Sequence, residues 1–314
     1  MSTPTPDIEV HTGSGRLPFS EGLLASSFMT AGVLPGEAFA AARRVHERLT
    51  AQASPLVATR TLRDLACAVL SEIDEHHAHR YRRWQLVDNL QAPLIVLLGG
   101  VTGVGKSTIA TQLAVRLRMT RVISTDTVRE VLRAAVPKDL LPALHTSSFH
   151  VFPSPCPSPE EPAEALITSF REQVQAVSVG ARAVIARAVE ERTSIIVEGS
   201  HVVPGHLACW ARQFPRTLLL PVLLTVSDAD THRSHFLRRG RETGSRVGER
   251  YLREFGNIRL IQAWLRDQAV DHGVTVVEVT ESESVLQDIV TVIADTASAA
   301  TTGRHASRSR SRAP

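Results

Sequence analysis

The chain has 314 residues and 43% apolar content, so it can bury one large core or two smaller ones, and the usual domain size of about 100–200 residues favours two. Its longest apolar run, Thr217 to Val226, is shorter than the roughly 18 residues of a membrane helix, and its three separated cysteines argue against a disulfide framework or a zinc site. The formal charge of +3 is outweighed by four arginines of the C-terminal tail, so the body of the chain shows no excess of charge for binding nucleic acid.

Residues 1–15 are rich in Ser, Thr, Pro and Gly and are predicted to be disordered. They lack a basic patch followed by an apolar stretch, so no secretion signal is expected and the cytoplasm is the predicted compartment. Amphipathic runs then begin near Leu23, Phe39 and Leu62. Residues 16–88 are therefore predicted to form a small helical domain.

Residues 92–296 alternate short apolar runs with helical patterns, which is typical of a parallel sheet with helices on both faces. The predicted strands are Leu94–Leu98, Val122–Ser124, Ile195–Val197, Leu218–Val226 and Val274–Val279. A proline-rich insertion, Pro137 to Pro162, is either a lid on the substrate side or a surface excursion. The tail, residues 297–314, is rich in Ser, Thr and Arg and is assigned no structure.

The segment Gly100–Ser107 fits the pattern G-x-x-x-x-G-K-[ST] and lies between a predicted strand and a predicted helix. In this setting backbone amides and a helix N-terminus bind phosphates, so the sequence predicts an α/β fold of the P-loop NTPase type that binds ATP. The predicted nucleotide-binding residues are Gly100, Thr102, Gly103, Val104, Gly105, Lys106, Ser107 and Thr108. Lys106 is expected to reach the β- and γ-phosphates in catalysis, and Ser107 to hold Mg²⁺.

Two acidic residues end predicted strands on the side where a parallel sheet collects its ligands. Asp126 is predicted to orient an acceptor hydroxyl and take its proton, or to hold a water on magnesium; the alternative is an N-cap. Glu198 is predicted to be a magnesium-organising acid, with a buried structural carboxylate as the alternative. His201 is assigned to anionic substrate, or else to a structural role.

Two groups of arginines complete the predicted site. Arg238, Arg239 and Arg241 follow the fourth strand and are predicted to stabilise the charge of the transferred phosphoryl group; a solvated basic face is the alternative. Arg129 and Arg133 lie four residues apart on one helix face and are predicted to bind an anionic acceptor, with an exposed pair as the alternative.

Several segments, in this order, resemble the 2-phosphoglycerate kinase family. They are Pro18–Ser20, Ala31–Val33, Gly99–Thr108, Val122–Asp126, Leu141–Ser148, Glu198–Gly199 with His201, Val203–Gly205 and Arg259–Gln262, within Arg16 to Ala294. The resemblance implies transfer of the ATP γ-phosphoryl group to the hydroxyl of 2-phosphoglycerate, giving 2,3-bisphosphoglycerate. It also implies an N-terminal ATP-cone, a nucleotide-sensing module, with Arg16, Phe19 and Ser20 carried over.

The expected partners are therefore ATP, magnesium and a small anionic phosphorylated hydroxy acid, with no membrane and no nucleic acid. Two alternatives stay open at this point. The first keeps the chemistry and changes the acceptor to another phosphorylated hydroxy acid or a nucleoside. The second is a regulator that binds nucleotide without rapid phosphoryl transfer. The sequence does not fix an oligomeric state.

Overall fold

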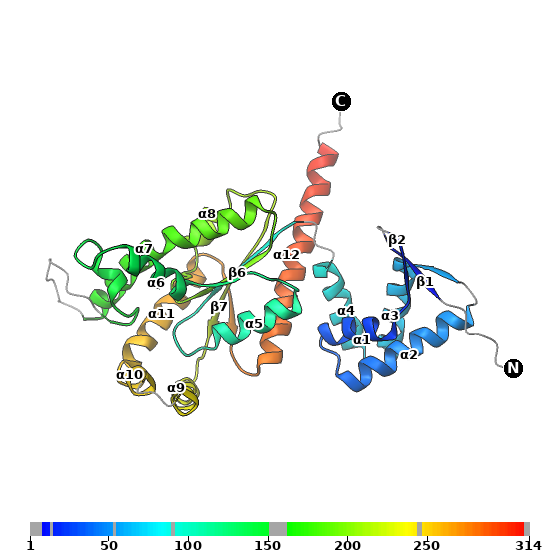
Figure 1. Ribbon diagram of the computed structural model, residues 1–314, viewed down its shortest axis with the longest axis horizontal. Coiled ribbons are helices and arrows are strands. Elements are labelled where there is room, and N and C mark those ends of the chain that lie inside the picture. Colours follow the sequence, from blue (N-terminus) through cyan, green and yellow to red (C-terminus); the bar gives the residue numbers. More distant parts are fainter. Residues whose placement is uncertain are drawn as a thin grey trace. The chain divides into compact units, whose positions relative to one another are not determined.

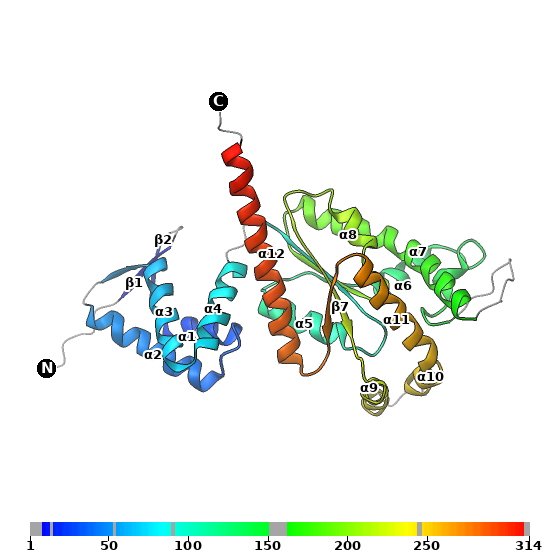
Figure 2. The same cartoon turned by 180° about the vertical axis from the view of Figure 1, so that it is seen from behind.

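The computed structural model describes residues 8–12, 15–52, 55–88, 92–150, 162–243 and 247–310. The chain divides into two compact units (Figures 1 and 2). One comprises Met1–Asn89 and Ile293–Pro314, and the other Leu90–Val292. The proline-rich part of the insertion, residues 151–161, lies outside the described residues.

The larger unit is built on a sheet of order β5-β6-β4-β7-β8 in which all neighbouring strands are parallel. The strands are β4 Leu94–Gly99, β5 Val122–Ser124, β6 Ile195–Gly199, β7 Leu218–Thr225 and β8 Thr275–Glu278. All five predicted strands are confirmed. Every residue of β4 and β6 is buried, which explains why β4 appears in the sequence as an unbroken apolar run and β6 as an apolar run up to Glu198.

Helices cover both faces of this sheet (Figures 1 and 2). The helices that begin in this unit are α5 Lys106–Arg116, α6 Thr125–Ala135, the 3₁₀ helix η1 Pro142–His145, α7 Pro162–Glu190, α8 His206–Ala211, α9 Ala229–Thr243, α10 Val247–Arg253, α11 Phe255–Asp271 and α12 Ser282–Arg310. Helices α7 and α8 pack on the face that carries Ile95 and Leu97. Helix α5 contacts β4, β5 and β6 and contributes Ile109 and Leu113 to the core. The predicted α/β class is therefore confirmed.

The strand order brings together the segments that follow β4, β5 and β6, at the carboxyl ends of these strands. β4 leads into α5, and β5, two positions away, leads into α6, while β6 lies between these two strands. In β6 the register pairs Glu198 with Leu98 of β4 and with Ser124 of β5. Because parallel strands end on the same side, the residues that follow β4 and β5 lie beside the end of β6.

The smaller unit contains the three predicted helices, together with a fourth helix, α4 Glu75–Asp88, and a sheet that were not predicted. The predicted helices are α1 Glu21–Thr30, α2 Pro35–Ala51 and α3 Thr59–Ile73; the strands are β1 Glu9–Thr12, β2 Gly15–Pro18 and β3 Leu56–Ala58, in the order β2-β1-β3. The prediction of disorder over residues 1–15 is wrong for β1. Ile8 and Val10 are buried, and Val10 pairs with Val57 of β3. This short alternation is hidden in a Ser- and Thr-rich context.

The C-terminal tail also differs from its prediction. Helix α12 continues to Arg310, through residues for which the sequence analysis assigned no structure. Proline, which would end a helix, is absent between Ser282 and Arg310, and alanine favours continuation. No helix in the described ranges combines the length and the apolar character that crossing a membrane requires.

Candidate active site

The phosphate loop depends on its glycines for its shape. Gly103 and Gly105 adopt φ of +89° and +86°, in the left-handed region that favours glycine. A side chain at Gly103 would meet the ring of Phe236 at 2.4 Å. On helix α9, His232 Nε2 and His235 Nδ1 lie 2.9 and 2.8 Å from the carbonyl oxygens of Thr102 and Gly103. Helix α9 thus holds the loop through two of its carbonyl oxygens.

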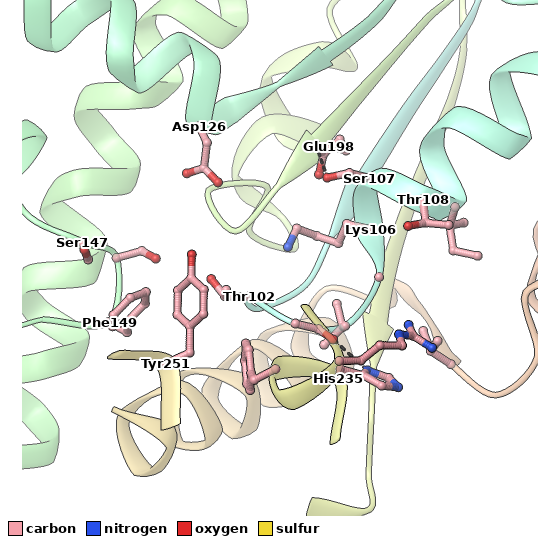
Figure 3. Close-up of a pocket in the computed structure, with 18 of the residues that line it drawn as sticks. Thr102, Lys106, Ser107, Thr108, Asp126, Ser147, Phe149, Glu198, His235 and Tyr251 are labelled. Atoms are coloured by element: carbon pink, nitrogen blue, oxygen red, sulfur yellow. Dashed lines mark hydrogen bonds between the residues drawn. The ribbon is translucent and has the colours of Figure 1, made fainter. Parts of the chain in front are cut away.

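Lys106 is the first residue of α5 and is only 9% exposed. Its ammonium donates a hydrogen bond to the Val101 carbonyl oxygen at 2.9 Å. The side chain reaches toward the middle of the cleft (Figure 3). A cation in this position, next to the positive end of a helix, is suited to binding phosphate.

Ser107 and Glu198 meet at the base of the cleft (Figure 3). The Ser107 hydroxyl donates to Glu198 Oε1 at 2.9 Å, and Glu198 is only 4% exposed. Because burying a carboxylate is unfavourable without a positive partner, a buried acid whose neighbour here is a neutral hydroxyl fits a site for a cation. The two residues predicted to organise magnesium are therefore brought together.

Asp126 lies in the first turn of α6, and its carboxylate points toward the cleft (Figure 3). The alternative assignment of Asp126 as the N-cap is wrong, because the cap is Ser124, whose hydroxyl accepts a hydrogen bond from the Asp126 amide at 3.1 Å. The Asp126 side chain is 61% exposed. Its carboxylate is accordingly available to a ligand in the cleft.

The predicted contact of His201 with substrate does not fit the structure, because His201 does not line the cleft, its ring is 1% exposed and both ring nitrogens are engaged. Nδ1 lies 3.0 Å from Thr125 Oγ1, and Nε2 lies 2.9 Å from Gln173 Oε1. Gln173 donates through its amide nitrogen to the Ala143 and Thr146 carbonyls, so its oxygen accepts from His201. Burial lowers the pKa of His201 from 6.5 to about 4, so the ring is neutral.

His201 is thus a structural residue, the second of the two roles considered for it. The turn after β6 carries the ring into the interior, where it anchors Thr125, the residue before Asp126. Its Nδ1 lies 4.0 Å from Asp126 Oδ1. We infer that His201 fixes the start of α6, and with it the position of the Asp126 backbone.

The predicted arginines do not all line the same cavity. Arg238 and Arg129 line the cleft. Arg129 donates to the Thr146 carbonyl oxygen at 2.7 Å, and Arg133 lines a smaller pocket that adjoins the cleft. The side chains of Arg239 and Arg241 lie outside the described residues.

The cleft, of about 740 Å³, also has walls that sequence reasoning missed. Ser147 and Phe149 come from the segment after η1, and Arg250 and Tyr251 come from α10. The Tyr251 ring packs edge-on against Phe149 with centroids 5.6 Å apart, and the two rings form one side of the cleft (Figure 3). Ser147 lies in a segment that carries the family resemblance, so it had a signal, whereas Arg250 belongs to an arginine-rich stretch without a motif.

Comparison with known proteins extends the family resemblance over most of the chain, although no family model matches it. A 2-phosphoglycerate kinase of Methanopyrus kandleri is 35% identical over 287 residues, which cover 91% of this chain and 86% of that protein. A 2-phosphoglycerate kinase of Thermococcus kodakarensis is 39% identical over 279 residues, covering 88% and 92%.

Among solved structures, shikimate kinase from Acinetobacter baumannii in complex with shikimate aligns with 68% of this chain and 97% of its own, at 14% identity and a TM-score of 0.39. That likeness is too distant to inform the function. The two sequence relatives are at least 35% identical to this chain, and each match covers 88% or more of it. The chain belongs to the 2-phosphoglycerate kinase family.

Proposed function

We propose that this protein transfers the γ-phosphoryl group of ATP to the hydroxyl of 2-phosphoglycerate, giving 2,3-bisphosphoglycerate and ADP. One observation carries the proposal. A complete phosphate loop and an accessible carboxylate, Asp126, line the same cleft in a chain that is 35–39% identical to proteins named 2-phosphoglycerate kinase.

The nucleotide end of the reaction belongs to the phosphate loop and to α5. Its backbone amides and the N-terminus of α5 bind the phosphates, and the Lys106 ammonium neutralises charge on the β- and γ-phosphates. Arg238 lines the same cleft and is proposed to stabilise charge on the phosphoryl group during transfer, together with Arg239 and Arg241.

The acceptor end belongs to Asp126. The acceptor hydroxyl oxygen forms a bond to the γ-phosphorus while the bond to the bridging oxygen breaks and ADP leaves. The hydroxyl proton passes to the Asp126 carboxylate, which is exposed to the cleft and therefore within reach of a bound ligand. Arg129 and Arg133 are proposed to bind the negative charge of the acceptor.

Magnesium is proposed to be held by Ser107 and Glu198. Their contact of 2.9 Å and the burial of the Glu198 carboxylate fit this assignment. When bound there, the ion would offset charge on the terminal phosphates of ATP.

The N-terminal unit is proposed to sense nucleotide, on the resemblance to an ATP-cone alone. Each of its carried-over residues has a partner within the unit. Ser20 caps α1 by accepting a hydrogen bond from the Leu23 amide. The rings of Phe19 and His46 have centroids 5.3 Å apart, and Arg16 Nη1 lies 3.7 Å from Glu9 Oε2. These contacts stabilise the unit itself, so the proposal of nucleotide sensing rests on the resemblance.

The experiment that tests the proposal is a coupled assay of ADP release with ATP and magnesium, in the presence and absence of 2-phosphoglycerate. Release that depends on 2-phosphoglycerate supports a kinase for this acceptor. Release that depends instead on another hydroxy acid or a nucleoside would replace the acceptor. Nucleotide binding with no acceptor-dependent release would favour the regulator.

A further inference from the structure

A second, strongly basic pocket of about 460 Å³ adjoins the cleft. Among the described residues it is lined by three arginines and two histidines but by only one carboxylate, that of Glu130. Arg129, Ser147 and Arg250 line both this pocket and the cleft, so the two cavities are neighbours. Its walls come from α6, from the end of η1 and the segment after it, and from α10.

The charges in this pocket are not balanced within the described part of the chain. Glu130 is shared, since it accepts from Arg129 at 2.9 Å and pairs with Arg133 at 2.7 Å. Arg250 donates to the Ser147 hydroxyl, and its guanidinium lies 5.7 Å from the centroid of the Phe149 ring. Among the described residues, no carboxylate forms an ion pair with Arg250.

Arg129 has one nitrogen without a hydrogen-bond partner in the described structure. This nitrogen is the buried Nε, and the side chain is only 16% exposed. That nitrogen is covered by protein atoms, so it offers no donor to a ligand in either cavity. Arg129 donates through Nη1 to the Thr146 carbonyl oxygen and through Nη2 to Glu130, and Arg133 pairs with the same carboxylate. Among the described residues, Arg250 is therefore the arginine of this pocket whose charge has no carboxylate partner, and an anionic ligand would supply one.

The two histidines of the pocket serve to hold its walls. His145 Nε2 lies 2.9 Å from the Val136 carbonyl oxygen, which fixes η1 to the end of α6. His150 Nε2 lies 2.9 Å from Glu254 Oε1, next to α10. These contacts leave the arginines as the groups that face a ligand.

We infer that this basic pocket binds the phosphate and carboxylate that the acceptor already carries, and that Arg250 with Ser147 selects the phosphate. The inference rests on the proposed function and names the residues that give it acceptor specificity. The planar guanidinium of Arg250 offers two parallel donors that match a phosphate. Because Arg250 and Ser147 line both cavities, an acceptor held by them would extend its hydroxyl into the cleft, toward Asp126.

The test uses 2-phospholactate, which keeps the phosphate and carboxylate of 2-phosphoglycerate but has a methyl group where the accepting hydroxymethyl group stands. Its binding to the full-length protein is measured by calorimetry, independently of turnover. Arg250→Met should weaken this binding about 10- to 100-fold, the range for loss of a hydrogen bond between charged groups. Arg250→Lys keeps the charge but not the planar guanidinium, so its affinity for 2-phospholactate should lie between those of the wild type and Arg250→Met. Arg253→Met is the matched control, because Arg253 is exposed on the same helix.

In the same variants, Arg250→Met should raise KM for 2-phosphoglycerate and leave the affinity for a nonhydrolysable ATP analogue unchanged. Unchanged 2-phospholactate affinity in Arg250→Met or in Arg250→Lys, or no binding by the wild type, overturns the inference. Arg250-dependent binding of 2-phospholactate without turnover of 2-phosphoglycerate would reject the proposed function and keep the pocket. If Arg250→Met does not fold, Arg250→Lys decides the question.

Discussion

Replacing Lys106 with methionine separates the chemistry of the phosphate loop from its folding. Methionine has a similar length but no charge, and the ammonium it removes is buried and bonded to the Val101 carbonyl. Loss of one preorganised group that stabilises transition-state charge typically lowers kcat by about 10²–10³, or about 2.7–4 kcal/mol. Because Lys106 carries a full charge in a nearly enclosed position, we expect a loss of about 10³ or more.

The effect of Lys106→Met on stability should be small because two contributions oppose each other. Removing a buried charge relieves its desolvation, whereas the Val101 carbonyl loses its donor at a cost of about 1–3 kcal/mol. We therefore expect a shift of no more than a few degrees in melting temperature.

The assay is acceptor-dependent ADP release, with thermal melting measured on the same sample. Lys138→Met is the matched control, because the chain has no lysine other than Lys106 and Lys138, and Lys138 is exposed on the surface. Lys138→Met should retain full activity. A Lys106→Met variant that keeps more than about a tenth of wild-type kcat/KM would refute the assigned role of the ammonium.

Three further predictions concern the carboxylate, the turn after β6 and the buried histidine. Asp126→Asn should lower kcat about 10²–10⁴-fold with unchanged ATP-analogue affinity, and a kcat near the wild-type value would remove Asp126 as the base. Gly199→Ala should destabilise the fold in urea titrations, since its Cβ would lie 1.8 Å from Thr125 Oγ1 at φ +147°, whereas Gly256→Ala, with open space around it, should be neutral or stabilising. The depressed pKa of His201 contributes stability that is present above pH 6.5 and lost as the pH falls toward about 4. The stability difference between wild type and His201→Gln should therefore shrink from about pH 7 to about pH 5, and a constant difference would contradict this role.

The parts of the fold predicted correctly are those whose signal is local. Buried parallel strands such as Leu94–Leu98 are continuous apolar runs, and the phosphate loop has a fixed pattern between a strand and a helix. Strand β1 was missed because only Ile8 and Val10 mark it, and its pairing with β3 joins residues far apart in the sequence. The small sheet therefore needed tertiary information.

In the site, too, residues with a local sequence signal were predicted, and residues placed by contacts between elements were not. Lys106 and Ser107 were predicted from the phosphate-loop pattern, Glu198 and Asp126 from their places at strand ends, and all four line the cleft. His201 was misassigned because sequence spacing does not tell whether a turn carries a ring into the cleft or into the core. Contacts between elements also hid Arg250, which reaches the cleft only because α10 packs beside the segment that carries Ser147 and Phe149.

The most direct test of the account is to follow the wild-type protein with ATP, magnesium and 2-phosphoglycerate by ³¹P nuclear magnetic resonance. We predict that 2,3-bisphosphoglycerate and ADP appear in equal amounts as ATP and 2-phosphoglycerate are consumed. ATP consumption that yields only inorganic phosphate, or no consumption while nucleotide is bound, would contradict it.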